Sequence, residues 1–165
     1  MRLLKLALIS LLILFVVSFG VSALLPSHVL VSRAVNIAAA PDSIRAHTAD
    51  IRQWQGWMEG MTDTSVHIQS ATQAVIGNTM VTIQSVTDTT VVSLWDNHRT
   101  APQLSTLRWI VQPQQQVTIV QWQFEQKLSW YPWEKFASMM NDKILGPMME
   151  RNLEQLRRSL EEKSK

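Results

Sequence analysis

Cysteine is absent from this sequence, and its absence excludes several functions at once. A chain without cysteine forms no disulfide bond, offers no thiolate ligand to a metal and has no cysteine nucleophile. Its stability therefore rests on a hydrophobic core, which is ordinary for a domain of about 140 residues.

An excess of charge is also absent from most of the chain. Of the 15 Lys and Arg residues, Arg2 and Lys5 precede residue 26, whereas none of the 13 Asp and Glu residues does. Beyond residue 26 the chain is therefore formally neutral. Binding to a phosphate backbone requires a cationic surface, so we do not expect a nucleic acid as a partner.

The signatures of metal and nucleophile sites are missing as well. The histidines fall in separate segments without the spacing of metal ligands, and the chain has no H-E-x-x-H, no G-x-S-x-G and no glycine-rich phosphate loop. We therefore expect neither a metal site nor a cofactor. The histidines in question are His28, His47, His67 and His98.

A long apolar run stands at the N-terminus of the sequence. Twenty consecutive residues from Leu6 to Leu25 carry no charge. As a helix they span about 30 Å, the thickness of the hydrocarbon core of a bilayer. Arg2 and Lys5 precede the run, so the positive-inside rule places the N-terminus in the cytoplasm and the rest of the chain across the membrane.

Two interpretations of this segment remain open, and both export the domain that begins at residue 27. Residues 3–25 are long enough for an uncleaved transmembrane anchor of the inner membrane, which would leave the domain periplasmic or extracellular. The small residues 21–23 also fit a cleaved signal peptide, which would release a secreted or periplasmic domain. In either case residues 1–26 form the anchor or signal segment and residues 27–165 form the domain. We favour the anchor because the apolar run is longer than the roughly 7–15 residues typical of the apolar region of a signal peptide.

The first part of the domain predicts a strand followed by short helices. In residues 28–37, β-branched residues alternate with others in a strand pattern. Pro41 suits the first turn of a helix, and residues 44–54 can continue as a helical stretch. One face of the strand comprises Val29, Val31, Arg33, Val35 and Ile37.

The remaining domain predicts several strands and a long C-terminal helix. Residues 64–126 are rich in Val, Thr, Ile and Trp and are interrupted by turn signals, which indicates an antiparallel meander. Between residues 133 and 161, apolar residues recur every three or four positions, as in an amphipathic helix. Pro147 predicts a kink or two tandem helices. The fold class is therefore α+β, with one long helix packed against a curved antiparallel sheet.

Three passages of the domain resemble the START-like, or SRPBCC, superfamily, and in particular its membrane-anchored bacterial proteins described as polyketide cyclase or dehydrase. The first is VSRAVNIAAAPDSIRAHTADIRQWQGW, with an Arg on the strand and a Trp-x-x-Trp pair. The second is the strand TIVQWQFE. The third is the closing helix, whose pattern is carried by Ile144, Gly146, Glu150, Leu153 and Leu156.

The resemblance implies a helix-grip fold, in which the sheet wraps the long helix and leaves a hydrophobic cavity between them. Members use such a cavity for lipids, sterols, polyketides or plant hormones, so an apolar small molecule or lipid is the expected partner. The sequence departs from the family where a Trp-rich continuation is replaced by Trp57-Met58-Glu59-Gly60. Contacts at that corner are therefore expected to differ.

Large apolar side chains are the candidates for the lining of such a cavity, although ordinary core packing is their other interpretation. Trp faces and adaptable Met side chains suit a pocket for varied apolar ligands. The candidates on strands are Trp95, Trp109 and Trp122, and those on the helix are Met139, Met140, Met148 and Met149.

Polar candidates come from the region after Trp95. His98 and Arg108 could supply a polar anchor in a mostly apolar pocket, and His98, Asp96, Glu125 and Arg108 are the candidate acids or bases for a cyclase-like reaction. The alternative for residues 96–99 is a simple loop at the end of a strand.

Three functions are compatible with the sequence. A membrane-tethered module that binds an apolar small molecule or lipid predicts a continuous apolar pocket. A cyclase or dehydratase requires a buried acid or base with a perturbed pKa in that pocket. A structural or interaction protein of the cell envelope predicts a filled core.

Overall fold

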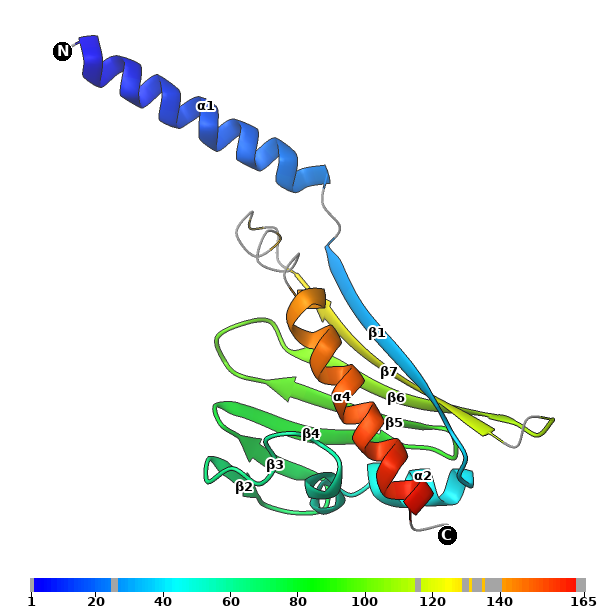
Figure 1. Ribbon diagram of the computed structural model, residues 1–165. Coiled ribbons are helices and arrows are strands. Elements are labelled where there is room, and N and C mark those ends of the chain that lie inside the picture. The colour runs from blue at the N-terminus through cyan, green and yellow to red at the C-terminus, as the bar shows by residue number, and fades with distance from the viewer. Residues whose placement is uncertain are drawn as a thin grey trace.

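The protein consists of a long N-terminal helix joined to an α+β domain (Figure 1). The computed structural model describes residues 2–24, 27–114, 117–128, 131, 135 and 141–162. Helix α1 (Arg2–Leu24) is strongly apolar and exposed along most of its length. By length and composition, its segment Leu4–Ser22 could cross a membrane.

A seven-stranded antiparallel sheet forms the body of the domain. Its spatial order is β1-β7-β6-β5-β4-β3-β2, so the first strand lies beside the last and the others follow as a meander. The strands are β1 (His28–Ile37), β2 (Val66–Ile68), β3 (Gln73–Ile76), β4 (Thr79–Val86), β5 (Thr90–Asp96), β6 (Gln103–Gln112) and β7 (Val117–Lys127).

Alternation along β1 sets its inner and outer faces, as the sequence predicts. Val31 and Ile37 are buried, whereas Leu30 is 59% exposed on the other side. On β7, Trp122 and Phe124 are buried on the same inner face, opposite Arg33 and Val31. The two strands thus present an apolar inner surface to the helix.

Helix α4 (Asn141–Glu162) lies across this inner face (Figure 1). Its buried stripe includes Met149, Leu153 and Leu156, which the periodicity predicts. The helix continues through Pro147 as one element rather than as two helices in tandem. Residues 133 and 136, where the sequence predicts its beginning, lie outside the described residues.

Two short helices close the end of the sheet near the end of α4. The single stretch predicted over residues 44–54 is divided into α2 (Pro41–Thr48) and the 3₁₀ helix η1 (Ile51–Gly56). The division falls at Asp50, whose carboxylate accepts a hydrogen bond from Arg52 N at 2.9 Å and so caps a new helix.

An aromatic cluster fills the space between η1, the sheet and the helix. Trp54 stacks on Trp95 with centroids 6.2 Å apart, and Trp57 and Trp122 meet edge to face at 5.9 Å. Phe124 contacts both Trp95 and Trp122. The Trp54 and Trp57 indoles also donate to backbone carbonyls of α2, at 2.9 and 3.0 Å, so this pair fastens the short helices to the core.

Candidate ligand-binding site

One row of inward-facing residues crosses the sheet at the end where β1 begins. Strand pairing places Val29 opposite Gln126, Gln126 opposite Gln103, and Gln103 opposite Trp95. Helix α4 begins at this same end, because Arg33, in the middle of β1, bonds to its first turns and Ala38 bonds to its last turn. We call this end of the domain the mouth.

Burial differs between the mouth and the interior beneath it. Trp122, Phe124 and Met149 are buried, whereas Val29 and Trp95 in the mouth row are only partly buried. In the first turns of α4, Leu145 and Met148 also pack against the core and are only partly buried. The mouth therefore presents apolar side chains that the domain itself does not fully cover.

The polar groups beside these apolar side chains are mostly paired. The Gln103 amide donates to Gln126 Oε1 at 3.3 Å, and Gln126 Nε2 donates to a backbone carbonyl at 2.9 Å. The Trp95 indole donates to Ser93 Oγ at 3.0 Å, and the Trp122 indole donates to Ser105 Oγ at 2.8 Å. The inner face of the sheet is thus apolar with a neutral, hydrogen-bonding strip.

Asn152 is an exception to this pairing. It lies fully buried in the apolar stripe of α4, and its Oδ1 accepts a hydrogen bond from Glu59 N at 2.9 Å. That bond fixes the orientation of the amide, and Nδ2 has no hydrogen-bond partner among the described residues. The sequence interpretation did not include Asn152, although a polar residue inside an apolar helical stripe is a signal of this kind.

Trp109 and Trp122 lie deep in the domain, and each is 1% exposed. The Trp109 indole donates to the Asp88 carbonyl oxygen at 2.8 Å. Trp95 is therefore the tryptophan of the three candidates that lies at the mouth. Of the methionines, Met149 is fully buried and Met148 partly buried, while Met139 and Met140 lie outside the described residues.

The polar candidates lie away from this interior. Arg108 is exposed and its side chain lies on the outer face of the sheet, because adjacent residues of a strand point to opposite faces and Trp109 points inward. Glu125 is likewise exposed on the outer face, with His28 Nδ1 3.6 Å from one of its oxygens.

His98 and Asp96 form a loop at the end of β5. The Asp96 carboxylate accepts a hydrogen bond from His98 N at 2.8 Å, and His98 adopts a left-handed backbone conformation with φ of 59°. This arrangement is a tight turn of the kind that Asp initiates. Residues 96–99 therefore form a loop at the end of a strand, which was the alternative that the sequence offered for them.

The perturbed pKa values belong to ion pairs at the surface of the domain. A hydrogen bond from Arg157 lowers the pKa of Glu154 to about 2, and a hydrogen bond from Arg52 lowers the pKa of Asp50. Hydrogen bonds to Glu150 and then Asp142 raise the pKa of Arg33. None of these ion pairs includes a residue of the mouth row.

Arg33 joins β1 to the beginning of α4. Its guanidinium donates to Glu150 at 2.7 Å and to Asp142 at 3.0 Å, and it covers Gly146. A Cβ added at Gly146 would overlap Arg33 Nη2 and lie 3.0 Å from Cζ. The Arg, Gly and Glu of the sequence resemblance therefore form one contact that fixes the helix over the sheet.

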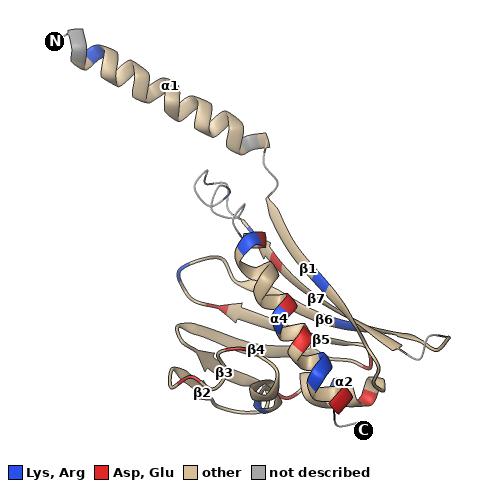
Figure 2. Ribbon diagram, in the orientation of Figure 1, with Lys and Arg blue, Asp and Glu red and all other residues tan. Residues whose placement is uncertain are grey.

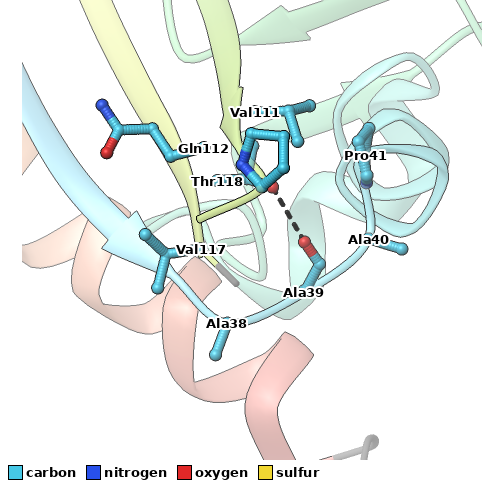
Figure 3. Close-up of a pocket in the computed structure, with 9 residues that line it drawn as sticks. Ala38, Ala39, Ala40, Pro41, Val111, Gln112, Val117 and Thr118 are labelled. Atoms are coloured by element: carbon cyan, nitrogen blue, oxygen red, sulfur yellow. Dashed lines mark hydrogen bonds between the residues drawn. The ribbon is translucent and has the colours of Figure 1, made fainter. Parts of the chain in front are cut away.

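Two open hollows lie at the other end of the sheet, opposite the mouth. The first has a volume of about 320 Å³ and is bordered by Ala38–Pro41 and by the β6–β7 turn, where Thr118 donates to the Ala39 carbonyl at 2.9 Å (Figure 3). The second, of about 540 Å³, is bordered by Arg108, Trp109 and neighbouring residues of β5 and β6. Both open to solvent, and neither includes a residue of the mouth row.

Comparisons with known proteins identify the family of the domain. A family described as "Polyketide cyclase / dehydrase and lipid transport" matches residues 28–161. A comparison with curated proteins finds no match.

Solved structures share the fold at low sequence identity. A START superfamily protein from Mycobacterium smegmatis is 15% identical, with a TM-score of 0.61 over 81% of this chain and 97% of its own. A protein from Thermobifida fusca is 12% identical, with a TM-score of 0.64 over 79% of this chain and 92% of its own. The di-domain ARO/CYC StfQ of the steffimycin biosynthetic pathway is 8% identical, with a TM-score of 0.63 over 83% of this chain. This chain spans about half of that longer protein, 52% of its length. These likenesses confirm the helix-grip, START-like fold.

Proposed function

The chain belongs to the polyketide cyclase/dehydrase and lipid transport family, and from that premise we propose that its domain binds an apolar small molecule or lipid at the mouth of the grip while α1 tethers it to a membrane. The observation that carries the proposal is the partial burial of Val29, Trp95, Leu145 and Met148 on the inner side of the fold. Apolar surface that a domain leaves partly uncovered is a common feature of binding sites.

The neighbouring polar groups support a ligand that is mostly apolar and uncharged. Gln103 and Gln126 are neutral amides that hydrogen-bond to each other in the mouth row. A carbonyl or hydroxyl group of a ligand can exchange hydrogen bonds with such amides without bringing a charge. The mouth row, which consists of Val29, Gln126, Gln103 and Trp95, contains no charged side chain that could pair with a charged head group.

The tether rests on the character of α1 and of the residues before it. Its segment Leu4–Ser22 is largely exposed and uncharged except for Lys5, and Arg2 lies on the N-terminal side. These features favour a single-pass anchor of the inner membrane with a cytoplasmic N-terminus and the domain on the other side. Cleavage of this segment as a signal peptide is the alternative that N-terminal sequencing tests.

A cyclase or dehydratase is a less favoured function for this domain. Such an enzyme needs an acid or base beside the bound substrate. Arg108 and Glu125 lie on the outer face of the sheet. Asp96 and His98 follow Trp95 at the mouth end, but Asp96 points to the outer face because Trp95 points inward, and the His98 side chain is 78% exposed.

The experiment is native mass spectrometry of the full-length protein in detergent, followed by extraction and identification of the bound molecule. Two variants at adjacent positions of β1 provide a matched pair. Val29→Asp places a charge on the inner face at the mouth, and Leu30→Asp places the same charge on the outer face.

We expect one apolar molecule per chain in the unaltered protein, its loss in Val29→Asp and its retention in Leu30→Asp. A folded protein that carries no such molecule, and that takes up neither fatty acids nor aromatic polyketides, would refute ligand binding. Equal loading of the two variants would place the ligand elsewhere.

A further inference from the structure

The connection between α1 and the domain is very short. Helix α1 ends at Leu24 and β1 begins at His28. Ser27 already belongs to the domain, because its carbonyl accepts a hydrogen bond from Leu128 N at 2.8 Å. Three extended residues reach about 10 Å, so the beginning of β1 cannot move far from the end of α1.

A second contact joins the last turns of α1 to the domain. Lys135 Nζ donates a hydrogen bond to the Ser22 carbonyl oxygen at 2.9 Å, and both residues are buried. A cation at the carboxyl end of a helix is also favoured by the helix dipole. The domain is therefore joined to the end of α1 both through the chain and through a side chain far along the sequence.

The mouth lies at this same end of the domain. The end of β7, the beginning of β6 and the end of β5 lie in line with the beginning of β1, because neighbouring strands of this sheet pair antiparallel. Helix α4 also begins there (Figure 1).

Exposed side chains at the mouth suit the interface between lipid and water. Ile144 in the first turn of α4 is 66% exposed, and Leu30 near the beginning of β1 is exposed on the outer face. Lys143 and Lys127 are exposed at the beginning of α4 and the end of β7, and the acids Asp142 and Glu125 are exposed beside them. Basic and acidic residues both occur along α4 (Figure 2). Apolar side chains with neighbouring long cationic ones are typical of segments that lie at a membrane surface.

We infer that the mouth docks on the surface of the bilayer that holds α1, so that the candidate site opens toward lipid rather than toward the surrounding water. This inference rests on the proposed tether and ligand site. The source of the ligand is then the membrane itself. An apolar molecule that passes directly between bilayer and mouth avoids the free-energy cost of entering water.

The absence of native cysteine allows a direct test with single-cysteine variants of the full chain. A fluorescent nitrobenzoxadiazole label is attached at Ile144→Cys at the mouth, at Gln114→Cys at the opposite end of the sheet, and at Ser10→Cys within α1. Positions 144 and 114 are exposed, so neither substitution disturbs the core. The protein is inserted into vesicles of phosphatidylethanolamine and phosphatidylglycerol that contain nitroxide-labelled lipids.

We expect a head-group nitroxide to quench the label at position 144 several-fold more strongly than the label at position 114, and a mid-chain nitroxide to quench the label at position 10. Strong quenching at position 10 with equally weak quenching at positions 144 and 114 would overturn the docking while leaving the tether intact. Absence of quenching at position 10 would refute the tether, and the docking with it.

Discussion

Truncation of Trp122 separates its role in the core from a role in ligand binding. Trp122 is 1% exposed, contacts the rings of Trp57 and Phe124, and donates its indole hydrogen to Ser105. Replacement of a fully buried Trp by Ala costs about 3–5 kcal/mol. The unpaired Ser105 hydroxyl, itself buried, adds about 1 kcal/mol. The sum, about 4–6 kcal/mol, is a large part of the roughly 5–15 kcal/mol that stabilises an ordinary domain.

Trp95 provides the matched comparison. It also contacts Phe124 and stacks on Trp54, but it is only partly buried, and its hydrogen bond goes to Ser93 on its own strand. We expect Trp95→Ala to cost about half as much as Trp122→Ala, since less of its surface leaves water on folding. At the mouth, its removal should reduce ligand loading in a protein that remains folded.

The assay combines urea unfolding of the full chain in detergent, monitored by circular dichroism, with native mass spectrometry of bound ligand. Trp122→Ala should shift the unfolding midpoint strongly, and Trp95→Ala should chiefly lower ligand occupancy. A Trp122→Ala protein whose free energy of unfolding falls by less than about 1 kcal/mol, and which binds no ligand, would refute the assignment of Trp122 to the core and of Trp95 to the ligand site. Removal of a core tryptophan costs several times that amount.

Three further predictions concern α4. Gly146→Ala should stabilise an Arg33→Met protein by about 1 kcal/mol through helix propensity. It should stabilise the unaltered protein less, because the new Cβ displaces the Arg33 guanidinium. A double-mutant cycle by urea unfolding measures this difference, and an equal stabilisation in the two backgrounds would contradict the contact between Arg33 and Gly146. Glu154 has a folded pKa of about 2, below its ordinary value of 4.5, so its ionised form stabilises the domain above about pH 4.5 and this contribution is lost as the pH falls toward 2. Carboxyl NMR titration of the folded protein checks this, and an ordinary pKa would exclude the pairing. Asn152→Ala removes the acceptor of the Glu59 amide, which costs about 1–3 kcal/mol, but it also removes the buried Nδ2, which has no partner among the described residues, and this offsets much of that cost. The free energy of unfolding measured in urea should therefore fall by less than about 1 kcal/mol, and a fall of about 3 kcal/mol would contradict the unpaired state of Nδ2.

Strand alternation and helix periodicity were sufficient to predict most of the fold. The inner residues of β1 and the buried stripe of α4 follow from periods of two and about 3.6. The β1 face and the stripe from Met149 to Leu160 are confirmed, whereas Ile144, predicted in the same stripe, is 66% exposed. The same alternation also limits which candidate residues can face the inner side of the sheet. Arg108 and Trp109 are neighbours on one strand, so the two cannot both point into the space beneath α4.

The contacts that fix the helix over the sheet were beyond reach of pattern reasoning. Arg33 lies 117 residues before Glu150, and Asn152 lies 93 residues after Glu59. Such pairs depend on the register of the sheet and on the rotation of the helix, which the hydrophobic pattern determines only to within a face. The division of the early helix at Asp50 similarly depends on a cap formed by one carboxylate.

The position of the mouth follows from topology more than from any single residue. Because β1 is the strand that immediately follows α1, its beginning lies beside the end of α1. Antiparallel pairing then brings one end of β7, β6 and β5 to that point, and Arg33 aligns α4 so that it also begins there. An anchor placed after α4 instead would hold the opposite end of the sheet, with its two open hollows, against the membrane. The order of elements therefore places the partly covered apolar side chains at the end of the domain that follows α1. With α1 as the proposed anchor, this order is the reason that we infer a ligand drawn from the bilayer.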